Sequence, residues 1–352
     1  MSTWNQLLQE FFAQPETDRA AWIDQHYTQA LADLSALRAN RNVIVMASAF
    51  LSKPDAPPSS LSISPEDING LMAVVYGMDC DKGLTIVLHT PGGQTNATET
   101  IVAYLWSKFS NIEVIVPAFA MSAGTMIALA SNKIIMGRQS QLGPIDPQMG
   151  VGGNYISARA IVEQFNRARL DIVGDPANGI VGDMAMAHVW APVLATIGPA
   201  LMQEAQNALD YSERMVAQWL SQRMVGEYEP DEIKATEKAQ TIAQHFNDAS
   251  VHLSHGRRID RDEARGVGVL VDDLEDDQKL QEAVLTLYHL MTITFEQGPS
   301  AKMISGSSGA AQKFPEHGSR RRPLGVVAPL EGFCGRAVVV DERQHLVDEV
   351  LA

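Results

Sequence analysis

Two stretches decide the fold: LTIVLHTPGG, residues 84–93, and IEVIVPAFAMSAG, residues 112–124. Each begins with a run of aliphatic and β-branched residues, which predicts a buried strand. Each ends in small residues and glycine, which predicts a tight turn that leads into a helix. Strand and helix patterns continue to alternate over 95–109, 122–131 and 133–137. The centre of the chain therefore predicts an α/β fold with parallel strands.

The pattern changes on both sides of this centre. Residues 1–40 carry apolar residues at helical spacing, which predicts a helical N-terminal extension. Residues 41–295 are expected to form the main domain. Residues 296–325 contain Gly, Ser and Pro throughout, so we expect a flexible linker there. Residues 326–352 are expected to regain order as a small C-terminal segment.

Charge and composition exclude several classes of partner. The chain has 27 basic and 42 acidic residues, a net charge of −15, which disfavours nucleic acid and anionic membrane surfaces. Residues 114–132 lack charge, but Pro117 and several small residues interrupt them, so we expect a strand, a turn and a helix rather than a membrane span. Two cysteines and an acidic N-terminal region without a basic residue before Arg19 predict a cytoplasmic protein.

The two glycine turns are where the chain carries chemistry. A serine at a turn between a strand and a helix, such as Ser122, is a candidate nucleophile, because attack on a carbonyl creates an oxyanion that needs backbone N–H donors nearby. The N–H of Gly92 or Gly93 and the N–H of Ala123 are the candidate donors. The start of a helix at Ser122 also favours negative charge.

Together with QLGPIDPQMG at 141–150, these stretches resemble the ClpP-like serine peptidases, and within them the serine dehydrogenase proteinase family, relatives of signal peptide peptidase A. The resemblance implies the ClpP/crotonase fold, a spiral of ββα units, and an enzyme that is usually an oligomer. It assigns the nucleophile to Ser122 and the oxyanion hole to Gly92, Gly93 and Ala123.

The general base is less clearly defined. Relatives of signal peptide peptidase A use a lysine after the serine, but no lysine occurs between Lys133 and Lys234. The resemblance implies the order Ser, Asp, His, in which Asp146 orients a later histidine that acts as base. It favours His255, and His252 is the alternative base.

Other residues are given structural roles. His89 flanks the oxyanion turn but precedes its glycines, so we expect a structural hydrogen-bonding residue rather than a base. Met184, Met186 and His188 lie in an apolar helical stretch and are expected to pack in the core. The acidic residues in 272–277 lack the spacing of a calcium loop, so no metal site is expected.

The sequence thus predicts a soluble ClpP-like serine peptidase that hydrolyses peptides or unfolded proteins through an acyl-enzyme on Ser122. The resemblance implies a homo-oligomer. We expect no cofactor, because neither a Walker motif nor a dinucleotide fingerprint occurs. Two alternatives remain open. A crotonase-type acyl-CoA enzyme would use the same two amides to hold a thioester enolate, and a non-catalytic oligomeric adaptor would retain only the fold.

Overall fold

A seven-stranded sheet forms the centre of the molecule in a computed structural model that describes residues 3–195, 200–309 and 311–315. The strand order is β11, β5, β3, β2, β1, β12, β13. Five neighbouring strands run parallel, namely β1 (Asn42–Ser48), β2 (Leu84–His89), β3 (Ile112–Val116), β5 (Lys133–Met136) and β11 (Val271–Asp273). Strand β12 (Ser300–Gly306) is antiparallel to β1, and β13 (Ala311–Pro315) is antiparallel to β12. This arrangement confirms the predicted α/β fold with parallel strands.

The central strands are buried on both faces, as their continuous apolar runs require. In β1, Ile44 and Met46 face one hydrophobic cluster, whereas Val43 and Val45 face another. Successive side chains of a strand point to opposite faces, so the sheet separates two cores.

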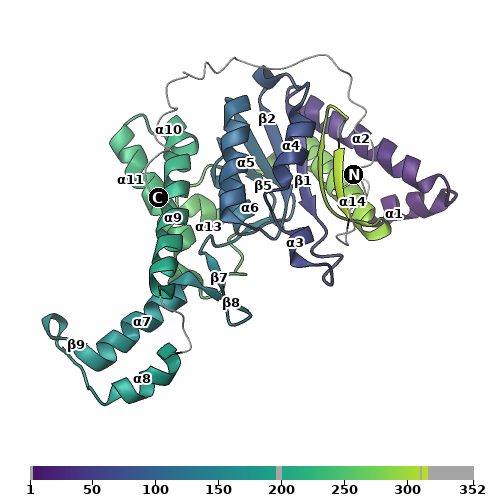
Figure 1. The fold of residues 1–352 in the computed structure, drawn as a ribbon. Helices are drawn as coiled ribbons and strands as arrows, with labels where there is room; N and C mark the ends of the chain where they lie inside the picture. The colour runs from purple at the N-terminus through teal and green to yellow at the C-terminus, as the bar shows by residue number, and fades with distance from the viewer. Residues whose placement is uncertain (1–2, 196–199, 310, 316–352) are drawn as a thin grey trace, which may run out of the picture.

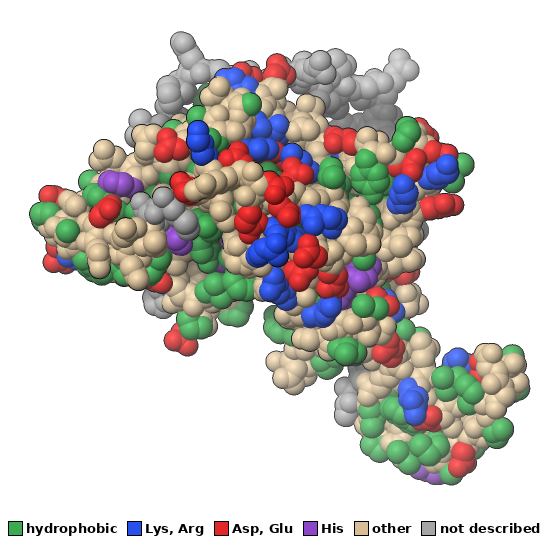
Figure 2. Space-filling view, turned by 180° about the vertical axis from the view of Figure 1, so that it is seen from behind, with side chains coloured by type: hydrophobic (Ala, Val, Ile, Leu, Met, Phe, Trp, Pro, Cys, Tyr) green, Lys and Arg blue, Asp and Glu red, His purple; other side chains and the backbone are tan. Residues whose placement is uncertain are grey.

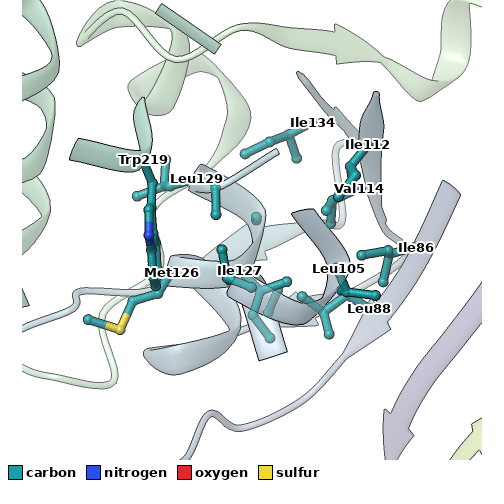
Figure 3. Packing of buried hydrophobic residues seen from close by; sticks show 14 of the residues in the cluster. Ile86, Leu88, Leu105, Ile112, Val114, Met126, Ile127, Leu129, Ile134 and Trp219 are labelled. Carbon is teal, nitrogen blue, oxygen red and sulfur yellow. The ribbon is translucent and has the colours of Figure 1, made fainter. Parts of the chain in front are cut away.

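Three helices that connect consecutive parallel strands cover the first face (Figure 1). They are α4 (Asp67–Val75), α5 (Thr95–Lys108) and α6 (Ala123–Leu129). Right-handed crossovers between strands that are neighbours in sequence order place their helices on one side of the sheet. Figure 3 shows α6 between strand residues such as Val114 and Ile134 and Trp219 of α9 (Leu201–Gln222).

The second face is covered by helices from the two ends of the described chain. They are α1 (Trp4–Ala13), α2 (Arg19–Leu37) and α14 (Gln278–Gln297) (Figure 1). Leu34 of α2 and Leu287 of α14 are both fully buried in the second cluster. The N-terminal helices are therefore part of the hydrophobic core on this second face of the sheet.

An arm formed by residues 158–195 projects from the body (Figure 1). It contains α7 (Ala158–Val173), the short strands β9 (Gly174–Asp175) and β10 (Ile180–Val181), and α8 (Met186–Ala195). Helix α8 has no buried residue. The expectation that Met184, Met186 and His188 pack in the core is wrong, since Met184 is 71 % exposed and His188 is exposed. Apolar residues need a facing surface to become buried, and α8 contacts little besides α7.

The remaining elements surround this framework. The helices are α3 (Pro58–Leu61), α10 (Met224–Tyr228), α11 (Glu232–Asn247), α12 (Ala249–His252) and α13 (Arg261–Gly266), with 3₁₀ turns η1 (Cys80–Lys82), η2 (Pro176–Asn178) and η3 (Leu274–Asp276). The short strands are β4 (Phe119–Ala120), β6 (Gln141–Leu142), β7 (Gln148–Val151) and β8 (Asn154–Ser157). Across the described ranges we find no helix with both the length and the apolarity needed to cross a membrane.

The expected linker at 296–325 is wrong where the structure has the end of α14, up to Gln297, and the strands β12 and β13. Strand β12 is buried along its whole length and pairs with β1. Its polar residues, which suggested a linker, have partners in the fold: Lys302 pairs with Asp67, and Ser305 hydrogen-bonds Tyr27 at 2.7 Å. Residues 316–325 of the expected linker and the expected segment 326–352 lie outside the described residues.

Candidate active site

Ser122 lies at a sharp turn between β4 and α6. Its backbone has φ 51° and ψ −116°, a conformation that a residue with a side chain rarely adopts. Such strain persists only where the surroundings enforce it, and it is frequent at functional sites. A nucleophile at a strained strand-to-helix turn presents its hydroxyl at the edge of the sheet. Ser122 is half-buried, whereas Ala123 is 1 % exposed.

The Pro-Gly-Gly turn after β2 packs directly against Ser122. Thr90 pairs with Ala120, with Thr90 N–H donating to the Phe119 carbonyl at 3.0 Å. Gly92 has φ +107°, and a Cβ placed on it would lie 2.7 Å from Ser122 Cβ and 3.2 Å from Ala123 N. Only a glycine fits at this position, so the two motifs of the sequence meet at one point.

Two backbone N–H groups are left without a partner among the described residues at this point. Ile63 donates to the Gly92 carbonyl at 2.8 Å and accepts from Gln94 N–H at 3.0 Å. In a parallel bridge of this kind the N–H of the middle residue, Gly93, points away from Ile63. Ala123 is the first residue of α6, so its N–H has no partner within the helix.

Gly92 differs from Gly93 in its hydrogen bonding. Its N–H donates to Thr90 Oγ1 at 3.1 Å, and Gly92 is buried while Gly93 is exposed. Gly93 and Ala123 therefore differ from Gly92, whose N–H is already engaged within the turn.

Pairing between short strands brings the segments that carry Asp146 and His255 next to the strand that leads to Ser122. Strand β4 is parallel to β6, with Ala120 opposite Leu142, and Leu142 forms an antiparallel bridge with Ile259. Asp146 follows this bridge on one segment, and His255 lies in a turn that precedes it on the other.

Asp146 and His255 form a hydrogen-bonded pair. His255 Nδ1 lies 2.7 Å from Asp146 Oδ1, and the aspartate side chain is 1 % exposed while that of the histidine is 28 % exposed. An ionised carboxylate only accepts hydrogen bonds, so Nδ1 carries the proton and Nε2 is left as a proton acceptor. Gln148 Nε2 donates to the other carboxylate oxygen at 2.8 Å. Nothing in the sequence distinguished Gln148, because this contact depends on the fold of the loop.

His252, the alternative base, has both ring nitrogens engaged. Nε2 lies 2.7 Å from the His245 carbonyl, and Nδ1 lies 3.0 Å from a guanidinium nitrogen of Arg257. Burial lowers the pKa of His252, and it is 3 % exposed. Because both ring nitrogens already have partners, His252 has no free ring nitrogen that could accept the proton of a serine hydroxyl.

His89 lies at the end of β2 among aromatic rings. Its ring centroid is 5.0 Å from that of Phe50, 5.9 Å from that of Phe119 and 5.2 Å from that of Tyr288. Burial lowers its pKa from 6.5 to about 4. Its Nδ1 is buried with no hydrogen-bond partner among the described residues, which does not fit the expected role of a structural hydrogen-bonding residue.

Within the described ranges, no cluster of three or more His, Cys, Asp or Glu could hold a metal ion. The acidic stretch 272–277 instead has cationic and backbone partners. Asp272 pairs with Lys133 at 2.6 Å, and Asp277 accepts N–H bonds at the start of α14.

A sheet of this topology, with a serine at a strained turn facing a glycine turn, is the arrangement expected of a ClpP-like serine peptidase. Residues 58–191 match the model of the family ClpP-like SDH-type serine proteinase. The predicted resemblance to this family is confirmed over that part of the chain. The match supports a ClpP-like serine peptidase in general terms.

Curated relatives share the centre of the chain. Uncharacterized protein MJ0137 of Methanocaldococcus jannaschii is 42 % identical over 88 residues, which is 25 % of this chain and 31 % of that protein. Uncharacterized protein MJ1495 of the same organism is 35 % identical over 105 residues, 30 % of this chain and 35 % of that protein. The matches thus span about a third of the length of these relatives.

Two solved structures align at low similarity. The 1510-N membrane-bound stomatin-specific protease (S97A mutant) has a TM-score of 0.35 and 20 % identity, covering 63 % of this chain and 79 % of that chain. An enoyl-CoA hydratase from Mycobacterium avium subsp. paratuberculosis has a TM-score of 0.22 and 14 % identity, and the alignment covers 64 % of this chain and 92 % of that chain. At these scores neither alignment bears on the chemistry of the site.

Proposed function

We propose that the chain hydrolyses peptide bonds through an acyl-enzyme on Ser122. His255 Nε2 takes the proton from Ser122 Oγ as the oxygen attacks the scissile carbonyl carbon. Asp146 accepts the hydrogen bond from Nδ1–H, fixes the tautomer and stabilises the imidazolium. The imidazolium then gives its proton to the leaving amine, and water hydrolyses the ester by the same route in reverse.

The N–H groups of Gly93 and Ala123 are the proposed oxyanion donors. Both are fixed by backbone pairing and by the start of α6, so they need no rearrangement when the carbonyl oxygen becomes negative. Preorganised donors of this kind typically contribute about 10²–10³ each to the rate.

The single observation that carries the proposal is the Asp146–His255 hydrogen bond, formed by segments that flank β6, the strand paired with β4 just before Ser122. A buried carboxylate that accepts from a partly exposed histidine leaves the other ring nitrogen available for proton transfer. A histidine with a merely structural role would not need a free nitrogen facing solvent.

Labelling with a fluorophosphonate probe tests the proposal. We expect one covalent adduct at Ser122, found by intact mass and peptide mapping. Ser122→Ala should remove it, whereas Ser107→Ala, at an exposed serine of α5, should not. A folded and assembled protein that forms no adduct at Ser122 would refute the proposed chemistry.

We further propose that the substrate is a peptide or an unfolded protein and that the chain forms a homo-oligomer. The substrate class rests on the family match. The oligomer is supported by the arm, where Val181 is 93 % exposed, Met184 71 % and Val189 61 %. Figure 2 shows hydrophobic side chains across the surface of this arm. Surfaces of this kind are typical of interaction sites.

Light scattering during gel filtration tests the oligomer. The double variant Val181→Asp/Val189→Asp should lower the measured mass. Ile233→Asp places the same charge at a 73 % exposed site outside the arm and should leave the mass unchanged. A wild-type monomer at micromolar concentration would contradict the expectation.

A further inference from the structure

Lys302 of β12 is a buried cation next to the catalytic edge of the sheet. It lies opposite Ser48, the last residue of β1, and its side chain is 7 % exposed. Its Nζ lies 2.5 Å from Asp67 Oδ1 and 4.8 Å from the centre of the Phe314 ring. A buried ion pair is weak evidence for stability, because desolvation offsets the attraction between the charges. The position of this pair therefore suggests another role.

The Lys302 ammonium holds the segment that precedes α4. It donates to the Ser62 carbonyl at 2.9 Å and to Ser64 Oγ at 3.4 Å. Asp67 also fixes this segment, because its Oδ2 accepts a hydrogen bond from Ser64 N–H at 3.0 Å. Residues 62–64 are thus fixed from one side by a single charged group and its counter-ion.

The other side of this segment holds the oxyanion turn. Ile63 makes both hydrogen bonds of the bridge to the Gly93 turn, at 2.8 and 3.0 Å. The backbones are so close that a Cβ on Gly93 would lie 2.2 Å from the Ile63 carbonyl oxygen. A shift of Ile63 must therefore move Gly93 and redirect its N–H.

We propose that Lys302 is a positioning residue that holds the Gly93 N–H in the orientation needed for an oxyanion, acting through Ser62, Ser64 and Ile63. The inference rests on the proposed function, in which this N–H stabilises the transition state. Lys302 itself is no candidate for the base, because its ammonium is engaged with the Asp67 carboxylate, the Ser62 carbonyl and Ser64 Oγ. Lys302 lies outside residues 58–191, the part of the chain that matches the family model.

The test combines local hydrogen exchange with the rate of probe labelling. Lys302→Met removes the ammonium but leaves the Asp67 carboxylate buried alone. The double variant Lys302→Met/Asp67→Asn is neutral, and its amide oxygen can still accept from Ser64 N–H. Lys313→Met serves as the control, because Lys313 lies on the adjacent strand with a 44 % exposed side chain and pairs with Asp24.

In the double variant we expect the amides of Ile63 and Gln94 to exchange at least tenfold faster, measured by mass spectrometry, with exchange in α14 unchanged. The second-order rate of fluorophosphonate labelling at Ser122 should fall at least tenfold. Lys313→Met should match wild type in both measurements.

Two results would overturn the inference. One is unchanged exchange at Ile63 and Gln94 with a wild-type labelling rate in the double variant. The other is a uniform rise in exchange that includes α14, which would mean that Lys302 only stabilises the fold. A wild-type protein that does not label would refute the function proposed for Ser122, and the exchange measurement would still decide whether Lys302 positions the turn.

Discussion

The burial of His89 as a neutral ring predicts that acid destabilises the fold. Its pKa is 6.5 ordinarily and about 4 in the folded protein, because the ring has little access to water. The unfolded chain therefore binds a proton at a higher pH than the folded chain does. The free energy of unfolding rises with pH wherever the unfolded state binds more protons. The contribution of neutral His89 to this free energy is therefore complete above about pH 6.5 and is lost as the pH falls toward 4.

The size of the effect follows from the pKa difference. At about 1.4 kcal/mol per pKa unit, protonation of His89 should cost the fold about 2 kcal/mol between pH 7 and pH 5, and about 3 kcal/mol by pH 4. Glu296 and Tyr288 line the same small cavity, and burial raises the pKa of both. Raised carboxyl pKa values act in the opposite direction as pH falls, so a comparison between variants is needed.

The assay is urea unfolding at pH 7 and pH 5, at one protein concentration, for wild type, His89→Gln and His188→Gln. His89→Gln removes the titration but keeps a polar side chain of similar length, and Glu296 titrates in all three proteins. Wild type and His188→Gln, whose histidine is exposed, should lose about 2 kcal/mol more stability than His89→Gln over this interval. Equal losses in all three proteins would refute the reasoning.

Two further predictions concern the site. Gly93→Ala should lower the fluorophosphonate labelling rate at least 100-fold, because the new Cβ would collide with the Ile63 backbone. Gly150→Ala is the control and should label as wild type does, because a Cβ there would have no atom within 4 Å. Labelling of Gly93→Ala at the wild-type rate would contradict this packing. Asp146→Asn should leave the thermal transition within a few degrees but lower the labelling rate about 10³-fold or more, because an amide favours the wrong tautomer of His255. Wild-type labelling by Asp146→Asn would remove Asp146 from the mechanism.

Local sequence signals predicted the part of the fold that depends on neighbours in sequence. The apolar run LTIVLH became β2 over residues 84–89, as expected, and the pattern at 95–109 became the helix α5 over Thr95–Lys108. The tight turn at Ser122 was also expected, from a strand that ends in small residues, whereas its strained backbone was not. These elements agree with prediction because one face or both faces of each are buried along their length.

Features that depend on distant pairing were not predictable in the same way. The apolar run VGVLV at 267–271 is typical of a strand, yet β11 begins only at Val271, where its pairing with β5 starts. The contact between Asp146 and His255 joins residues that are far apart in the sequence, and no local pattern encodes it. The resemblance to a family supplied that pair of residues.

Strand β12 shows most clearly why polar composition misleads. Ser, Lys and Gly in SAKMISG suggested a linker, because an isolated segment of this composition gains little from burial. In the fold, two of its buried polar groups are compensated by a partner on another element, Lys302 by Asp67 and Ser305 by Tyr27. In the proposed mechanism the motifs at Gly93 and Ser122 supply the chemistry, and in the inference drawn from Lys302 the geometry of Gly93 depends on a strand that the motifs do not contain. Substitutions in β12 should therefore affect catalysis more than their distance along the sequence suggests.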